Sequence, residues 1–250
     1  MSQEGLRAFR SGAAYYETLF DSVSRLDRES ALLDAVLQRA PGRHIVDLAC
    51  GTGPHALFFA ERGAQVDAFD LSAEMIAHAA ATRPHPGIRY RTGDLRDPQG
   101  GPWDLALCLG NSLSLLPSRG GLARSLERLR AHMAPGGLYL IQMINYAGAA
   151  QREPVHRVVR KSIGDIQVTA VKSLVPQDEN MLLSLAFYAM QGREHESVAE
   201  SAILLALRRA ELTALAEAAG WRVADTYGAF DRSPYDPGTS PDLILLLENA

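Results

Sequence analysis

The segment Ile45-Val-Asp-Leu-Ala-Cys-Gly-Thr-Gly53 constrains the fold most, because a short apolar run leads directly into a glycine-rich turn. The apolar run has the length of a buried strand, and Pro54 suits the first position of a following helix. Glycine permits positive φ angles and lets a ligand approach the backbone without a Cβ in the way. A helix start also presents unpaired N–H groups to a polar ligand group. The segment therefore predicts a ligand-binding turn between a buried strand and a helix.

Alternating strand and helix patterns on both sides of this turn define the fold class. We expect a first helix over residues 15–40, and helical spacing also separates the later apolar runs. The turn Pro135-Gly136-Gly137 is expected to precede the fifth strand. The first five strands are expected at 44–49, 65–70, 88–91, 103–109 and 138–144. Strands that alternate with helices favour an α/β fold with a doubly wound, mostly parallel sheet.

The pattern changes near residue 150, where helical spacing disappears and turn-rich segments separate the apolar runs. The strands expected there are 155–159, 166–175, 181–190 and 197–205, followed by a helix at 209–219 and strands at 221–227 and 242–248. We expect residues 1–150 and 207–250 to form a Rossmann-like, seven-stranded sheet with a reversed final hairpin. Residues 151–206 are expected to form a small antiparallel β insertion after the fifth strand, which would act as a lid over the substrate.

Composition and charge narrow the function classes. The formal net charge is −4, which gives no bulk attraction to nucleic acid, so no nucleic-acid partner is expected. No apolar run approaches the ~20 residues of a membrane helix, and the N-terminus has no apolar signal core. Cys50 and Cys108 have no partner at metal-ligand spacing, so we expect two reduced thiols and no metal. These features favour a cytoplasmic protein that acts on a small molecule, alone or as a homo-oligomer.

Carboxylates at the expected strand ends favour a nucleoside ligand. Asp70 closes the second strand, where a carboxylate can accept hydrogen bonds from both ribose hydroxyls. Asp47 lies inside the first strand, where an acidic group is unfavourable unless it meets polar groups of the loop or ligand. After the third strand, Asp94 and Leu95 can flank an adenine. The sequence therefore predicts a nucleoside site at this edge of the sheet.

Two cofactors fit this pattern. The spacing Gly51-x-Gly53-x-x-Ala56 also matches the dinucleotide fingerprint, so an NAD(P)-dependent oxidoreductase is one alternative. A nucleoside-binding module without catalysis is another, because no catalytic base stands out in the sequence. The end of the chain has the order helix, strand, loop, strand, rather than a second nucleotide-binding half. This order favours S-adenosylmethionine.

The successive motifs resemble those of class I S-adenosylmethionine-dependent methyltransferases. Asp47–Gly53, Asp70-Leu-Ser72, Gly93-Asp94 and Asp104–Leu109 occur in the order of that class, and Leu243–Leu247 resembles its reversed final strand. The resemblance covers almost the whole chain outside the insertion and implies S-adenosyl-L-methionine as cofactor. The cofactor contacts it implies are Tyr16, Arg28, Asp47, Ala49, Gly51, Gly53, Asp70, Leu71, Met75, Asp94, Leu95, Leu109 and Ser112.

A narrower resemblance concerns the methyl acceptor. Cys108-Leu-Gly-Asn-Ser112, Asn145-Tyr146 and the inserted hairpins resemble glycine N-methyltransferase and related small-molecule N-methyltransferases, and sugar-amine N-methyltransferases are similar in the first half. In those relatives an arginine of the first helical region holds the methionine carboxylate, and Arg28 is the nearest match. An aromatic residue near the start covers the cofactor, which implies Tyr15 or Tyr16. Ile144 stands where the glycine enzymes have an arginine for the substrate carboxylate, which argues against glycine as acceptor.

The expected reaction is transfer of a methyl group to a small molecule, at nitrogen more than at oxygen. Positioning can supply about 7–11 kcal/mol of such a displacement, and a neutral amine needs no strong base. We expect Asn111 at the reaction centre, since it follows the fourth strand at the edge where α/β sheets bind ligands, although turn chemistry alone also explains an asparagine there. Tyr146 shares that edge and is expected to line the acceptor pocket. His55 follows the glycine turn and is expected on a helix surface.

Overall fold

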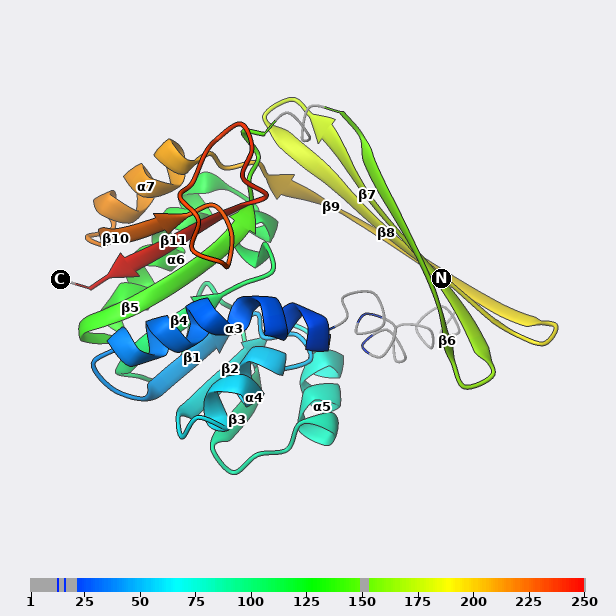
Figure 1. The fold of residues 1–250 in the computed structure, drawn as a ribbon, viewed down its shortest axis with the longest axis horizontal. Coiled ribbons are helices and arrows are strands. Elements are labelled where there is room, and N and C mark those ends of the chain that lie inside the picture. The colour runs from blue at the N-terminus through cyan, green and yellow to red at the C-terminus, as the bar shows by residue number, and fades with distance from the viewer. Residues whose placement is uncertain (1–12, 14–15, 17–21, 149–152, 250) are drawn as a thin grey trace.

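The computed structural model describes residues 13, 16, 22–148 and 153–249, and its largest element is a seven-stranded sheet (Figure 1). The strand order is β10-β11-β5-β4-β1-β2-β3. Its parallel strands are β1 (His44–Leu48), β2 (Gln65–Asp70), β3 (Ile88–Thr92), β4 (Trp103–Cys108) and β5 (Met133–Ile144). β11 (Asp242–Glu248) runs antiparallel to both β5 and β10 (Arg222–Tyr227). The predicted doubly wound sheet with a reversed final hairpin is confirmed.

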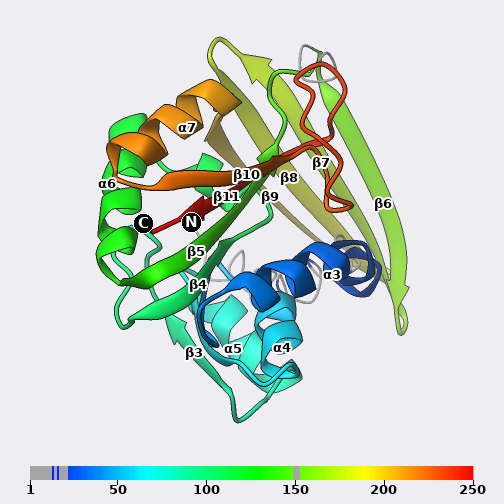
Figure 2. The same ribbon diagram turned by 60° about the vertical axis from the view of Figure 1, so that its left-hand side comes forward.

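Helices cover both faces of this sheet, because neighbouring strand residues face opposite sides. In β1, Ile45 packs with apolar residues of α3 (Ser22–Arg39) and α4 (Pro54–Ala60). Val46 packs with α6 (Arg119–Ala131) and α7 (Arg209–Ala218) on the other face. α5 (Ala73–Thr82) follows β2, and Figure 2 shows the two helical layers on either side of the sheet. Among the described helices, none is long and apolar enough to cross a membrane.

One expected turn lies inside a strand. Residues 135–137 belong to β5, although Gly136 has the positive φ of 70° that a turn glycine would show. The pairing of β4 with β5 shifts register between Trp103 and Leu105, so the extra residues form an irregularity rather than a connection. The expected first helix also differs in its range, because α3 ends at Arg39 and most of residues 15–21 lie outside the described part of the chain.

Four long strands after β5 form a second sheet. β6 (Val155–Ile163), β7 (Ile166–Gln177), β8 (Asn180–Gln191) and β9 (Glu194–Leu205) pair in sequence order, all antiparallel, as predicted. Two-residue turns that contain Gly164 and Gly192, both at positive φ, join β6 to β7 and β8 to β9. We call this the inserted sheet; it stands beside the seven-stranded sheet and extends away from it (Figure 1).

The two tryptophans of the chain allow a comparison of how side-chain hydrogen bonds stabilise the core. Trp103 is fully buried and donates its Nε1–H to the carboxylate of Asp67 at 2.9 Å, whereas Trp221 donates to the backbone oxygen of Leu126 at 3.0 Å. A hydrogen bond to a charged group is worth more than one to a neutral group. We expect Trp103→Phe to lower the free energy of unfolding by about 2 kcal/mol and Trp221→Phe by about 1 kcal/mol. Urea denaturation measures both, and the reverse order would contradict this assignment.

Candidate functional site

The glycine-rich turn follows β1 and is held by the carboxylate that ends β2. Asp70 accepts a hydrogen bond from the Gly51 N–H at 2.8 Å and another from the Ser72 N–H at 2.9 Å. Gly51 and Gly53 have φ angles of 56° and 82°, which suit glycine. A Cβ on Gly51 would meet no atom of the described residues within 4 Å, so these residues leave the turn open on that side. The turn is therefore fixed by Asp70 and accessible to a ligand at Gly51.

Asp47 is the acidic residue of β1, and only 1% of its surface is exposed. The Ala56 N–H donates to its carboxylate, but Oδ2 has no hydrogen-bond partner among the described residues. Burial raises the pKa of Asp47 to about 6, and the charge of Asp70 adds to this effect against His55 and Arg25. A buried oxygen without a partner costs roughly 1–3 kcal/mol. A polar ligand group at this position would remove that cost.

A buried polar network joins α3 to the helix that follows the turn. Glu29 is 3% exposed and accepts hydrogen bonds from Arg25 Nε and His55 Nε2, both at 2.6 Å. Burial alone would raise the pKa of Glu29, but the hydrogen bonds and charges of His55 and Arg25 outweigh burial and lower it. The guanidinium of Arg25 is thereby held at the end of β4, where its Nη1 would lie 3.5 Å from a Cβ on Gly110.

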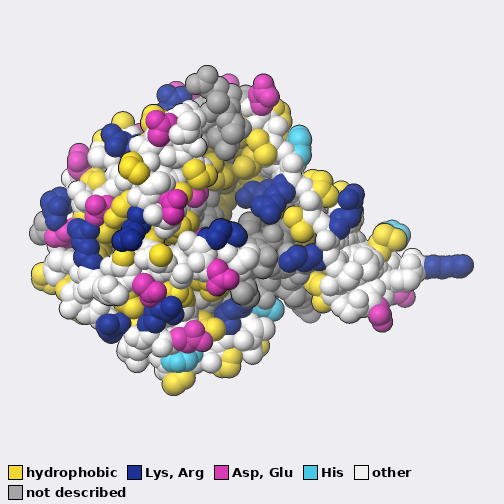
Figure 3. All heavy atoms as spheres, viewed as in Figure 1, with side chains coloured by type: hydrophobic (Ala, Val, Ile, Leu, Met, Phe, Trp, Pro, Cys, Tyr) yellow, Lys and Arg dark blue, Asp and Glu magenta, His cyan; other side chains and the backbone are white. Residues whose placement is uncertain are grey.

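A cavity of about 750 Å³ lies between these strand ends and the inserted sheet. Its walls come from three parts of the chain: Tyr16, Arg25, Arg28 and Glu29; Gly110, Asn111, Ser112, Ile144 and Asp242; and, from the inserted sheet, Arg157, Lys172, Leu183, Leu185, Glu200 and Ala202. Figure 3 shows a hollow between the two parts of the molecule, with Lys and Arg side chains beside it. Burial, opposed by Arg25 and assisted by Asp70, raises the pKa of Tyr16. Tyr16 thus lines the cavity within reach of the charge of Asp70.

Asn111 and Tyr146 form one hydrogen-bonded group at the ends of β4 and β5. Asn111 has a left-handed backbone, and its Nδ2 donates to the Tyr146 hydroxyl at 2.7 Å. Its Oδ1 accepts the Ile144 N–H at 3.0 Å and the Ser114 hydroxyl at 3.1 Å. Asn111 lines the cavity, whereas Tyr146 is 8% exposed and its pKa is raised by burial. Tyr146 packs in the core behind Asn111 and is not among the described residues that line this cavity, so its expected place in the acceptor pocket stays a prediction.

The other expected contacts beside the turn have varied surroundings. Leu71 directly follows Asp70 and is 72% exposed, which is unusual for a leucine of this chain. Ala49 lies in the turn with a φ of 58°, and the Met75 N–H donates to the side chain of Ser72 at the start of α5. Ser112 lines the cavity and donates to the backbone oxygen of Leu109, which is itself 5% exposed. Leu71 and Ser112 are therefore accessible to a ligand.

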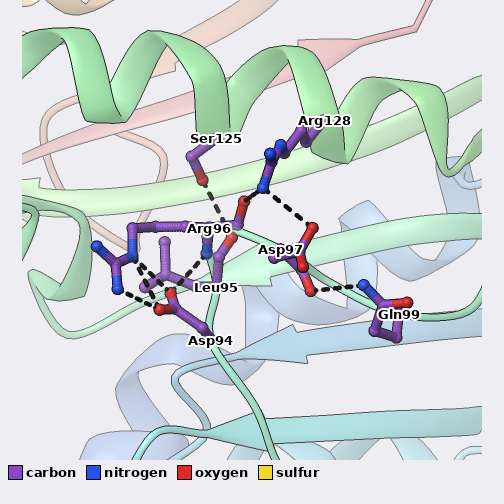
Figure 4. Close-up of polar contacts among 7 residues, drawn as sticks. All are labelled: Asp94, Leu95, Arg96, Asp97, Gln99, Ser125 and Arg128. Atoms are coloured by element: carbon purple, nitrogen blue, oxygen red, sulfur yellow. Dashed lines mark hydrogen bonds and ion pairs between the residues drawn. The ribbon is translucent and has the colours of Figure 1, made fainter.

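The loop after β3 carries two further expected cofactor contacts, Asp94 and Leu95. Asp94 points its carboxylate to Arg96, which forms hydrogen bonds with both of its oxygens and lowers its pKa (Figure 4). The backbone oxygen of Leu95 accepts the Ser125 hydroxyl at 3.1 Å, which ties this loop to α6. Neither residue belongs to the walls of the cavity. Arg28 does line the cavity and is exposed. Tyr15 lies outside the described residues.

Sequence patterns did not single out Arg25, Glu29 and Asp242. The i, i+4 spacing of Arg25 and Glu29 on one helix is a signal for their ion pair. His55 is 5% exposed, so the expectation of a surface histidine was wrong, because Glu29 covers it from α3. Asp242 begins β11, and burial raises its pKa against the hydrogen bond from Gln142. No group of three His, Cys, Asp or Glu among the described residues is arranged to hold a metal ion.

The raised pKa of Asp47 predicts a pH dependence of stability. The folded state binds this proton more tightly than the unfolded chain, so Asp47 contributes stability at low pH that is lost as the pH rises through about 6. Relative to Asp47→Asn, the free energy of unfolding should fall by about 2 kcal/mol between about pH 4 and pH 7. Urea denaturation over a pH series measures the difference. Asp97→Asn, at an exposed position, is the control, and a pH-independent difference for Asp47→Asn would contradict the assignment.

Comparison with known proteins agrees with this geometry. Residues 45–137 match a family described as a methyltransferase domain. A dTDP-3-amino-3,6-dideoxy-alpha-D-glucopyranose N,N-dimethyltransferase from Streptomyces fradiae is 33% identical over 118 residues, which are 46% of this chain and 46% of that protein. Glycine N-methyltransferase from Rattus norvegicus is 30% identical over 142 residues, 50% of this chain and 48% of the relative. The matched segments thus span about half the length of these curated relatives.

Solved structures extend the similarity to the whole fold. An S-adenosylmethionine-dependent methyltransferase from Clostridium acetobutylicum superposes with a TM-score of 0.80 at 15% identity and covers 96% of this chain and 98% of its own. An amino pentose methyltransferase from Micromonospora echinaspora, solved with S-adenosylmethionine bound, has a TM-score of 0.74 at 22% identity, over 94% of this chain and 97% of its own. Residues 45–137 thus match a methyltransferase domain, and the chain has the fold of the S-adenosylmethionine-dependent methyltransferases.

Proposed function

We propose that this protein transfers a methyl group from S-adenosyl-L-methionine to a small-molecule acceptor, at nitrogen. The observation that carries the proposal is the glycine turn, which Asp70 fixes at the same sheet edge as the ends of β4 and β5 that line a large cavity under the inserted sheet. Support also comes from relatives named as N-methyltransferases of an amino sugar and of glycine. Residues 1–150 and 207–250 would hold the cofactor, and residues 151–206 would cover the acceptor.

The turn has the groups that a nucleoside with an amino-acid tail requires. Asp70 uses one lone pair of each oxygen on the turn, which leaves further lone pairs for ribose hydroxyls. The exposed side chain of Leu71 offers an apolar surface to a flat base. The unpartnered Oδ2 of Asp47 suits a cationic or N–H group, and Arg25 suits a carboxylate. Asp94 could accept from the adenine only if Arg96 released its carboxylate, and the expected adenine contacts of Asp94 and Leu95 stay predictions.

Catalysis in this proposal rests on positioning. The sulfonium of the cofactor supplies an already activated methyl carbon, so the protein has to orient the acceptor and exclude water. Among the cavity residues, we place Asn111 at the reaction centre, where its hydrogen bond to the Tyr146 hydroxyl holds it. We also propose a cytoplasmic location, since Cys50 and Cys108 are buried free thiols. Assembly into a homo-oligomer stays a prediction.

Binding of S-adenosylhomocysteine and NAD separates the proposal from an oxidoreductase. Asp70→Asn should weaken S-adenosylhomocysteine binding by about 1–3 kcal/mol, because the ribose hydroxyls lose a charged acceptor. Isothermal titration calorimetry measures both ligands. The control variant Asp97→Asn removes a carboxylate at an exposed position, and it should bind S-adenosylhomocysteine like the wild type. Tight NAD binding without S-adenosylhomocysteine binding would overturn the proposed function.

Arg25 and Arg28 make a second, independent test. Arg25 is fixed by Glu29 at the strand end, so we assign the cofactor carboxylate to Arg25 in place of Arg28. Arg25→Met should weaken S-adenosylhomocysteine about tenfold and leave 5′-methylthioadenosine, which lacks the carboxylate, nearly unchanged. Arg28→Met is the matched variant on the same helix. A selective loss with Arg28→Met instead would return the role to Arg28, and an equal loss of both ligands would mean that Arg25 acts through the fold.

A further inference from the structure

A single row of residues crosses the inserted sheet where it faces the cavity. Arg157 on β6 pairs with Lys172 on β7, Lys172 with Leu185 on β8, and Leu185 with Glu200 on β9. All four residues line the cavity. Directly paired residues of antiparallel strands lie on the same face of a sheet, with Cβ atoms about 4.5–5.5 Å apart. The row therefore presents two cations at one end, an apolar residue in the middle and a carboxylate at the other end.

Apolar rows flank this polar row on the same face. One neighbouring row consists of Val155, Leu174, Leu183 and Ala202, and the other of Val159, Ala170, Phe187 and Val198. Of the three charged residues, Lys172 is partly buried in this surface and loses hydration there, whereas Arg157 and Glu200 are exposed. Stability alone does not favour a lysine at position 172, because an apolar side chain there would continue the surface without the loss of hydration. The charges are therefore placed where a ligand can meet them.

The cationic end is the most informative part of the row. Arg157 and Lys172 are like charges directly opposite each other, which destabilises a strand pair. Burial, together with the charges of Arg157 and Arg25, lowers the pKa of Lys172. An anion between the two side chains would offset both the repulsion and the lost hydration. Glu200 lies two strands from Lys172, about 10 Å at the usual strand spacing, and would repel an anion from its own end.

We infer that the methyl acceptor carries an anionic group, a carboxylate or a phosphate, which Arg157 and Lys172 of the inserted sheet bind. This inference rests on the proposed function and adds the chemical class of the acceptor. The anion lies at the β6–β7 end of the cavity, and the rest of the acceptor extends past Leu185 to the strand ends near Asn111. Ile144 offers no charge at the end of β5, and Arg25 of α3 is assigned to the cofactor, so Arg157 and Lys172 of the inserted sheet are the cations proposed for the acceptor.

The two lysines of the chain make a direct measurement practical. The sequence contains Lys161 and Lys172 and no other lysine, so ¹³C-lysine labelling gives one resonance for each. Lys161 lies on the same face of β6 as Arg157 but outside the cavity walls, and it serves as the internal reference. The probes are sodium acetate for a carboxylate and sodium phosphate for a phosphate, against sodium chloride at constant ionic strength and pH.

We expect one of the two probes to shift the Lys172 resonance saturably while the Lys161 resonance stays nearly constant. Arg157→Gln should weaken the apparent affinity of that probe about tenfold. Arg160→Gln, on the opposite face of the same strand, should leave it unchanged. Saturation by acetate identifies a carboxylate acceptor and saturation by phosphate a phosphorylated one. Equal small shifts of both lysines, or loss of binding in both variants alike, would overturn the inference.

The same titration with S-adenosylhomocysteine present separates this inference from the proposed function. If the cofactor product binds and the anion still shifts Lys172, both proposals hold. If S-adenosylhomocysteine itself shifts Lys172 and abolishes anion binding, the cationic pair holds the cofactor carboxylate and the acceptor assignment is wrong. If S-adenosylhomocysteine does not bind but the anion does, the proposed function fails while the anion site stands. The two failures therefore give different results.

Discussion

The buried carboxylate of Glu29 is the interaction on which the candidate site depends. It joins Arg25, four residues earlier on α3, to His55, which lies just after the glycine turn. Burying an ion pair contributes little net stability, because desolvation offsets much of the attraction. The network instead fixes the position of α3 relative to the helix that follows the glycine turn. α3 cannot move along the sheet edge without separating a buried carboxylate from both partners, at a cost of roughly 3–5 kcal/mol for a broken buried pair.

Position matters here because the site is assembled from three separate segments. The strand ends supply Asn111 and Asp242, α3 supplies Arg25, and the inserted sheet supplies Lys172. Each segment has its own means of fixing register. In the inserted sheet, the short turns at Gly164 and Gly192 set the pairing, and a slip of one residue would move the whole polar row to the opposite face. The cavity therefore depends on turn chemistry far from its walls.

The parts of the fold that sequence predicts well are those governed by local periodicity. β1, the glycine turn and the helix starting at Pro54 follow from neighbouring residues, and the inserted strands follow from alternation between turns. The bulge in β5 was not predicted from the sequence, because Gly136 is a typical turn glycine with positive φ. Only the pairing with β4 shows that the strand continues. The hydrogen-bond network around Glu29 was not predicted from the sequence for a related reason. Its ion pair with Arg25 is local, but His55 is 26 positions away, and burial by α3 is not visible in either segment.

The hydrogen bonds of Asn111 limit what this residue can do in catalysis. Its Oδ1 already accepts from the Ile144 N–H and the Ser114 hydroxyl, and one Nδ2 hydrogen is directed to Tyr146. An amide oxygen has two lone pairs, so only the second Nδ2 hydrogen is left for a ligand. Asn111 can therefore donate to an oxygen of the acceptor but cannot accept the N–H of an amine.

A methyl-accepting amine thus needs another partner in the cavity, and the carboxylate of Asp242 is suitably placed. It lines the same cavity, and among the described residues its carboxylate accepts only from Gln142, at Oδ1, so Oδ2 keeps its lone pairs toward them. Gln142 also accepts the Gly110 N–H through Oε1 at 2.7 Å, which fixes Asp242 relative to the loop that carries Asn111. In the proposed reaction Asn111 would orient an oxygen of the acceptor while Asp242 would orient its N–H. The spacing of the Asn111 and Asp242 side chains, rather than a general base, would then determine which nitrogen of the acceptor meets the methyl group.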